Sequence, residues 1–283
     1  MQPNESANAG LARKLREMAG VLTEQNADGF RIAAYRRAAD TVENLAKPVS
    51  EIVAEAGPSA LIALPAIGRS IASSLVELVE TGRWSALDRL TGALEPERLF
   101  QTVPGIGPEL AHSIHERLHV DILEALEVAA NNGNLTEVPG IGPRRCSAIR
   151  ALLKERLDRG QFRSKADGDS PSSADLLSVD AEYRHKAGKG DLKMIAPRRF
   201  NPEGRAWLPV LHAERGPWSF TALHSNTHRA HQLDRTQDWV VVFAHQSDGA
   251  EKQFTVVTEH RGPLAGKRVI RGRESECIAH YSR

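Results

Sequence analysis

The 283-residue sequence predicts an all-α N-terminal half built from helical hairpins, followed by a smaller α+β C-terminal domain with an antiparallel sheet. Two observations predict this division. A five-residue turn, apolar-Pro-small-Ile-Gly, occurs three times before mid-chain, at residues 64–68, 103–107 and 138–142. Beyond residue 173 the apolar residues instead form short strand-like runs, separated by Gly, Asn, Asp or Ser.

The first domain is predicted at residues 8–90. A helix begins near Leu11, from which apolar residues recur every three or four positions as far as Leu22. After a turn at Asp28-Gly29, a second helix runs over residues 30–45 and ends before Pro48. Two shorter helices, at residues 52–56 and 71–79, flank the first repeated turn, and Thr81-Gly82 ends the later one.

The second domain is predicted at residues 91–159, where the other two turns lie back to back. Helical patterns follow both turns, and Leu118, Ile122 and Leu126 lie between them. Residues 160–173 are rich in Ser, Asp and Gly and predict an interdomain linker.

Each repeated turn predicts a helix-hairpin-helix unit that contacts phosphate. We expect its Gly residues to supply positive φ and to remove the Cβ atoms that would hold a phosphate away, while the Ile anchors the turn in the core. The next helix begins directly after the turn, in two copies with Pro108 or Pro143 at its first position. Its unpaired amides and positive dipole end can bind an anion without a charged side chain. The first copy departs from the pattern because Ala66 replaces a Gly.

Composition limits the class of protein. No run of eighteen apolar residues occurs, and the first ten residues are neither basic nor apolar, so we expect a cytoplasmic, nucleoid-associated protein without a membrane or secretory segment. Cys146 and Cys277 are too few for a disulfide framework. Residues 1–160 carry a net charge of −3 and residues 161–283 a net charge of +4, so neither half is a polycation. Binding to DNA must therefore depend on local geometry, with a moderate salt dependence.

Four segments resemble the N-terminal region of family X DNA polymerases, the polymerase-beta-like group. They are residues 30–39, 64–72, 80–83 and 103–108. The resemblance covers about residues 8–160. It implies an eight-kilodalton-like helical domain that grips the 5′-phosphate side of a nick or gap, and a fingers-like hairpin subdomain that holds the duplex backbone.

The sequence departs from that family where catalysis would need it. Polymerase activity requires a palm with a Gly-Ser or Gly-Gly turn, an Arg and paired Asp residues that hold two magnesium ions. We expect no Asp-x-Asp pair beyond Leu157. Family members with lyase activity carry a Lys nucleophile where this chain has Ser74, and a second Lys often lies where it has Ser70. We therefore expect neither activity from this half.

The residues predicted to contact DNA belong to the turns or lie on the helix at residues 30–45. Those in the turns and the helices that follow are Gly68, Arg69, Gly105, Ile106, Gly107, Gly140, Ile141, Gly142 and Arg144. By resemblance, Tyr35 would line the 5′-phosphate pocket, with Arg31, Arg36 and Arg69 beside it. Alternatively, Tyr35 belongs to the small helical core and the three Arg side chains are solvated. The resemblance also implies a monovalent cation, K⁺ or Na⁺, on the turn carbonyls of the second or third copy.

The C-terminal domain, residues 174–283, resembles no family that we identify. A helix is predicted at residues 174–187, a loop at 197–204 and a closing helix at 274–281. Strands are predicted at residues 207–212, 218–224, 239–245, 254–258 and 268–271.

Three groups in this domain could carry chemistry. The spacing of His224, His228 and His231 would place them on one helical face as a weak metal candidate, with Glu259, Asp238 or His280 as further ligands; otherwise they lie on a polar loop. Residues 261–273 interleave basic residues with Gly and could contact phosphate or form a solvated strand face. Residues 225–231 suit a binding loop or a helix cap.

The leading interpretation is a non-catalytic, bacterial-type DNA-repair protein that binds duplex DNA without reading its sequence and docks on nicks, gaps or ends. Its C-terminal domain would add a protein partner or a second nucleic-acid surface. The alternative is a nuclease or lyase whose active site lies in the C-terminal domain, at the histidines or at Arg271, Glu259 and His280. A third interpretation is a protein–protein adaptor that uses the hairpins to bind another chain.

Overall fold

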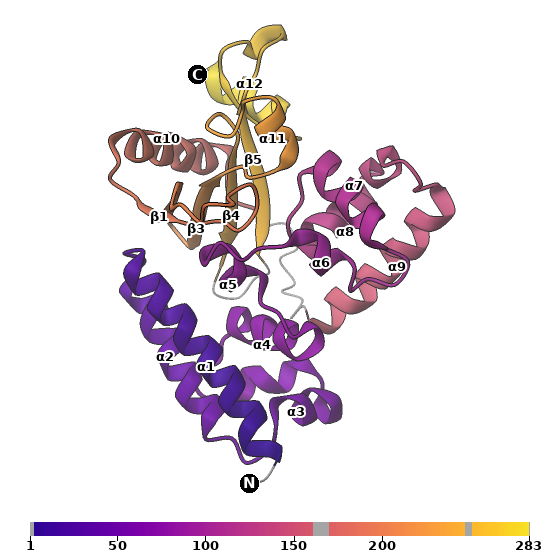
Figure 1. The fold of residues 1–283 in the computed structure, drawn as a ribbon, viewed down its shortest axis with the longest axis vertical. Coiled ribbons are helices and arrows are strands. Elements are labelled where there is room, and N and C mark those ends of the chain that lie inside the picture. The colour runs from indigo at the N-terminus through magenta and orange to yellow at the C-terminus, as the bar shows by residue number, and fades with distance from the viewer. Residues whose placement is uncertain (1–2, 161–169, 247–250, 283) are drawn as a thin grey trace. The chain divides into compact units, whose positions relative to one another are not determined.

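The computed structural model describes residues 3–160, 170–246 and 251–282 (Figure 1). The chain divides into two compact units, a helical one that contains the described residues up to 160 and a mixed one that begins at residue 170. Each unit is considered by itself. Residues 161–169 of the predicted linker lie outside the described residues.

The helical unit opens with two long helices that run side by side, α1 (Pro3–Glu24) and α2 (Gly29–Glu43) (Figure 1). α1 begins before the predicted Leu11, whereas the start of α2 is where the turn at Asp28-Gly29 predicts it. The Asp28 side chain accepts a hydrogen bond from the Arg31 amide at 3.0 Å and so caps the helix. Leu15, Met18 and Leu22 are fully buried, as their spacing predicts.

The first hairpin is built from α3 (Val49–Ala56), a 3₁₀ helix η1 (Pro58–Ala63) and α4 (Arg69–Thr81). α4 ends at Gly82, whose φ of 68° makes it a left-handed C-cap. A short helix that the sequence analysis does not predict, α5 (Ser85–Leu90), follows.

The second and third hairpins share one core. Their elements are α6 (Pro96–Phe100), α7 (Pro108–Leu118), α8 (Leu123–Asn131), η2 (Asn134–Glu137) and α9 (Pro143–Gly160). Both Ile residues of the turns, Ile106 and Ile141, belong to this core, together with Leu126 between the hairpins. Leu118 packs against the core, and Ile122 is buried. Pro108 and Pro143 start α7 and α9, as predicted.

The second unit contains a six-stranded antiparallel sheet in the order β1-β2-β3-β4-β5-β6, so that strands adjacent in sequence are adjacent in space. The strands are β1 (Lys193–Ile195), β2 (Leu208–Arg215), β3 (Trp218–His224), β4 (Val240–His245), β5 (Lys252–Thr258) and β6 (Arg268–Ile270). The five predicted strands and the antiparallel sheet are confirmed. β1, only three residues long, and the short helix α11 (His228–Gln232) are not predicted.

Two helices pack on this sheet, α10 (Ser173–Lys189) and α12 (Glu274–Tyr281), and a 3₁₀ helix η3 (Gly262–Leu264) precedes β6. The core includes fully buried Tyr183 of α10 and Phe220 and Val242 of the sheet. Within the described residues, no helix is both long enough and apolar enough to cross a lipid bilayer.

Candidate nucleic-acid interface

The three repeated turns have the same backbone geometry. In each, the amide of the Ile donates to the carbonyl of the apolar residue three positions earlier: Ile67 to Leu64 at 3.3 Å, Ile106 to Val103 at 3.1 Å and Ile141 to Val138 at 3.0 Å. The residue after the Pro has positive φ in every copy, at Ala66 (59°), Gly105 (88°) and Gly140 (86°). A Pro followed by a residue with positive φ is the pattern of a type II β-turn.

The second Gly of each turn has a different role from the first. Gly68 and Gly107 have φ of −78° and −84°, which any residue adopts, so the prediction that both glycines supply positive φ is wrong. Among the described residues, nothing lies within 4 Å of where a Cβ would stand on Gly107 or Gly142. The missing side chain therefore leaves open space at the surface rather than room for this protein's own atoms.

The turns face solvent. Ile67, Ile106 and Ile141 are only 3–4% exposed, whereas the Pro and Gly residues around them are exposed. In the described part of the chain, no side chain caps the first turn of α4 or α7. The amides at these helix ends are thus directed toward the exposed corner, and the two Ile residues on the predicted contact list can contribute only their backbone.

Two hydrogen bonds that support the turns are not predicted from the sequence. The Thr41 hydroxyl of α2 donates to the Pro65 carbonyl at 2.9 Å and links this helix to the first turn. The Arg145 guanidinium donates to the Gly140 carbonyl at 2.8 Å and braces the third turn. Arg144, its neighbour, is exposed beside that turn.

Tyr35 lies in the small helical core. It is 5% exposed, and its ring centroid is 5.6 Å from that of Trp84. Arg31 is half-buried and Arg36 is exposed, with its guanidinium 3.4 Å from the Thr23 hydroxyl. Arg31 precedes Thr41 by ten residues, which is about 15 Å along a helix axis, so it lies well away from the first turn. Tyr35 thus belongs to the small helical core, and a contact of these side chains with a 5′-phosphate stays a prediction.

Serines occupy the positions at which family X members with lyase activity carry lysines. Ser74 and Ser70 lie on α4, where the Ser74 hydroxyl donates to the Ser70 carbonyl at 3.0 Å. One Asp-x-Asp spacing does occur beyond Leu157, at Asp167-Gly168-Asp169, and it lies outside the described residues.

The three candidate histidines do not gather into a metal site. His224 ends a strand rather than lying on a helix, and burial, reinforced by the positive charges of Arg184 and Arg268, lowers its pKa to about 4. His228 and His231 belong to α11, where both pack against the ring of Phe200. The prediction that the three share one helical face is wrong because β3 extends through His224, and the strand and the helix direct their residues differently.

Two arginines of the basic stretch at residues 261–273, Arg268 and Arg271, form ion pairs within the protein. Arg268 is 12% exposed and bridges Asp180 and Asp238, each at 2.7 Å. Arg271 pairs with Glu259 at 3.2 Å, while Glu259 also accepts the amides of His260 and Arg261. These backbone bonds, followed by the Arg271 charge, lower the pKa of Glu259. This arrangement stabilises the turn between β5 and β6.

Comparison with known proteins agrees with the hairpin geometry. Residues 6–84 match the family described as "Helix-hairpin-helix domain", and residues 97–155 match "SAM-like Helix-hairpin-helix tandem". A similar curated protein is the "Holliday junction branch migration complex subunit RuvA" of Nocardia farcinica (strain IFM 10152), 32% identical over 76 residues. The match covers 27% of this chain and 38% of that protein. The N-terminal half of the chain is therefore a helix-hairpin-helix region of the DNA-binding kind.

Proposed function

We propose that this protein binds duplex DNA through the sugar-phosphate backbone, independently of sequence, and acts in DNA repair by docking on nicks, gaps or ends. The observation that carries the proposal is the repeated exposed turn, in which the amides of a helix end face open space beside a glycine without a Cβ. Phosphate contacts of this kind fix the position of a protein on DNA but carry no base identity.

The charge distribution supports backbone amides rather than a cationic surface as the main contact. Residues 1–160 have 18 Lys and Arg against 21 Asp and Glu. A surface of this composition repels DNA on average, so the attraction must be concentrated at the three turns. Few counterions would be released on binding, and the affinity would fall only moderately with salt.

Two separate similarities suggest two candidates for the preferred DNA structure. The resemblance of residues 8–160 to family X polymerases favours a nick or a gap with a 5′-phosphate. The name of the RuvA relative instead refers to a Holliday junction, which makes four-way DNA the main competing ligand. The spacing of the turns on one rigid surface would decide between them.

The tested ligands are intact, nicked, gapped, 5′-phosphorylated gapped and four-way DNA, each labelled with a fluorophore. Fluorescence anisotropy with the full chain at two salt concentrations gives the affinities. We expect nicked and gapped duplexes to bind at least about tenfold more tightly than intact duplex, a difference of about 1.4 kcal/mol. Equal affinity for all duplexes would contradict docking on breaks, and a preference for four-way DNA would assign the protein to junctions instead.

A monovalent cation at the second turn forms part of the proposal. The Gly140 carbonyl of the third turn already accepts a hydrogen bond from Arg145, but the corresponding position in the second hairpin is Leu110, which cannot donate. The second turn therefore suits K⁺ or Na⁺ better, bound by carbonyl oxygens next to a phosphate. The C-terminal unit, with the net positive charge of residues 161–283, would add a second nucleic-acid or protein contact.

A further inference from the structure

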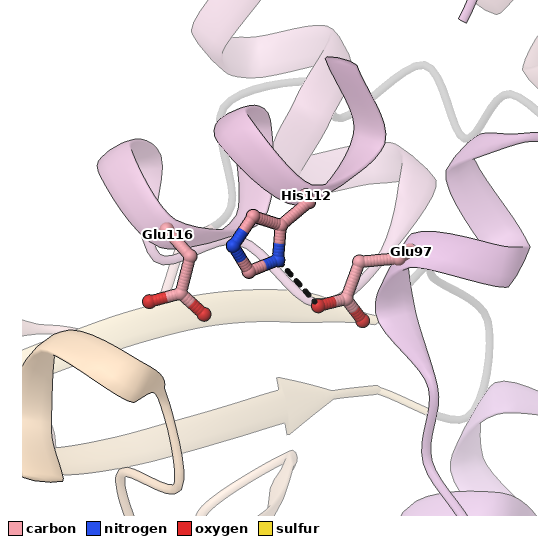
Figure 2. A group of neighbouring side chains, drawn as sticks. All are labelled: Glu97, His112 and Glu116. Atoms are coloured by element: carbon pink, nitrogen blue, oxygen red, sulfur yellow. Dashed lines mark ion pairs between the residues drawn. The ribbon is translucent and has the colours of Figure 1, made fainter. Parts of the chain in front are cut away.

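Three side chains with metal-binding atoms converge beside the second hairpin. Glu97 comes from α6, and His112 and Glu116 come from adjacent turns of α7 (Figure 2). One ligand atom from each lies within 4.8 Å of those from the other two, and the His112 Nδ1 is 3.5 Å from a Glu97 carboxylate oxygen. Of the residues that the structure describes, only these form such a group.

The two carboxylates are not ordinary solvated surface groups. The Glu97 and Glu116 side chains are 18% and 13% exposed, so much of their hydration is lost. Placing two poorly hydrated carboxylates side by side is costly unless positive charge lies near them. His112, by contrast, is 57% exposed and can adjust its ring.

A buried histidine holds both carboxylates in place. His115 is 2% exposed; its Nδ1 is 3.3 Å from Glu97 and 3.5 Å from Glu116, and its Nε2 is 2.9 Å from Asp121. Burial alone would lower the pKa of His115, but hydrogen bonds to Asp121, Glu116 and Glu97 outweigh it and raise the pKa to about 10. A histidine fixed in this way positions neighbouring ligands as outer residues of metal sites do.

These five side chains carry a surplus of negative charge. Three carboxylates face two imidazoles, so the group stays negative even when both rings are protonated. A divalent cation offsets this surplus, and His112 binds it as a neutral imidazole, as a ligand must. One imidazole nitrogen with two carboxylate oxygens is a donor set that suits transition metals, whereas Mg²⁺ and Ca²⁺ prefer oxygen alone.

We propose that Glu97, His112 and Glu116 bind a divalent transition-metal ion, with Zn²⁺ as the representative. Bonds of about 2 Å in a tetrahedral site place ligand atoms about 3.3 Å apart, so the group must contract slightly, which rotation of the exposed His112 ring allows. Water would take the remaining position. His115 acts as a positioning residue and not as a ligand.

The site would fasten together the two helices of the second hairpin. Glu97 lies before the turn at residues 103–107 and the other two ligands lie after it. α6 has only five residues and cannot be stable alone, so a metal bond from α6 to α7 would hold this hairpin in one geometry. The metal is thus assigned a structural role beside the turn.

The full chain, stripped with EDTA and dialysed, provides the test. Isothermal titration with ZnCl₂, and separately with MgCl₂, measures binding, and thermal unfolding measures stabilisation. We expect one Zn²⁺ equivalent that is lost or weakened at least about tenfold in Glu97→Gln, His112→Gln and Glu116→Gln, together with loss of the Zn²⁺-induced rise in Tm.

Two variants serve as matched controls, Glu109→Gln on the same helix and His280→Gln in the other unit; both should bind Zn²⁺ as the parent does. His112 is exposed, so His112→Gln should fold normally. This variant therefore still tests the proposal if a Glu variant fails to fold. Absence of Zn²⁺ binding by the parent, binding of Mg²⁺ alone, or unchanged Zn²⁺ affinity in His112→Gln would each overturn the proposal. DNA plays no part in these measurements, so the result is independent of the proposed function.

Discussion

At the scale of single residues, each hairpin turn divides two tasks between two small residues. The first, Ala66, Gly105 or Gly140, has positive φ and makes the turn possible. The second, such as Gly107, has an ordinary extended backbone and an empty space where a Cβ would stand. Only the first is required for folding, and the second can be required only by a ligand.

Replacing the second glycines should separate binding from folding. In Gly107→Val with Gly142→Val, the added Cβ atoms meet no described atom within 4 Å apart from the flanking residues, so the thermal unfolding curve should change little. The branched side chains would block phosphate from the amides, and we expect affinity for gapped duplex to fall at least about tenfold, or about 1.4 kcal/mol. Fluorescence anisotropy measures the affinity.

The matched control for these substitutions is Gly20→Val on α1, which also adds a side chain in open space but far from any turn. It should bind DNA as the parent does. A folded Gly107→Val, Gly142→Val protein with unchanged affinity would remove the turns from the mechanism.

Substitutions at the first small residue of each turn should change the stability of the protein, unlike those at the second glycine. Ala66 has φ of 59°, which strains a residue with a Cβ, so Ala66→Gly should stabilise the protein by about 1 kcal/mol. The mirror substitution Gly105→Ala should destabilise it by a similar amount, since Gly105 has φ of 88°. Urea denaturation of both variants tests the pair, and stabilisation by Gly105→Ala would refute this account of the turn.

At the scale of elements, the sequence predicts those parts that local chemistry determines. Asp28 and Gly82 fix helix ends, and short apolar runs bounded by Gly, Asn, Asp or Ser identify five of the six strands. α5, α6, α11 and β1 are not predicted because they have three to six residues and depend on packing against distant segments.

In the candidate site, too, the features set by local sequence are predicted and those that join distant residues are not. The turns are predicted from their repeat, whereas the bond from Thr41 to Pro65 joins residues 24 positions apart and leaves no local pattern. The spacing of the three histidines in the C-terminal half led to a wrong prediction of one shared helical face, because that prediction assumed a helix where β3 continues. The His112-x-x-His115-Glu116 pattern on a real helix is the sequence feature that could have indicated the metal-ligand cluster.

The end of β3 makes the second unit sensitive to acid. His224 has a pKa of about 4 in the fold, because it is buried beside Tyr183 and near the charges of Arg184 and Arg268, whereas the ordinary pKa of histidine is 6.5. The unfolded chain therefore takes up a proton first, and stability is lost as pH falls from about 6.5 toward 4. Between pH 7 and pH 5 the loss should be about 2 kcal/mol.

Urea unfolding of the full chain at the two pH values, followed by tryptophan fluorescence, measures this loss. His224→Gln should remove most of it, while the exposed His185→Gln, in the same unit, should keep it. Equal pH dependence in the parent and in His224→Gln would show that other groups govern acid stability.

At the scale of the whole molecule, the two units differ in both architecture and charge. The helical unit is net negative and carries all three turns, and the sheet unit contains a buried ion-pair network in which Arg268 joins α10 to the sheet through Asp180. Only the helical unit matches known helix-hairpin-helix families. The backbone contacts proposed for the turns are therefore a property of the helical unit, and the contact proposed for the sheet unit must be tested separately.

The strand order of the sheet unit bears on how that unit forms. Because every strand pairs with its neighbour along the chain, each ladder closes only a short loop and no connection must cross from one edge to the other. Chains with such local pairing generally fold faster than those with distant pairing. During synthesis, hairpins could thus assemble one after another as the polypeptide emerges, with β6 joining the sheet after the other five strands.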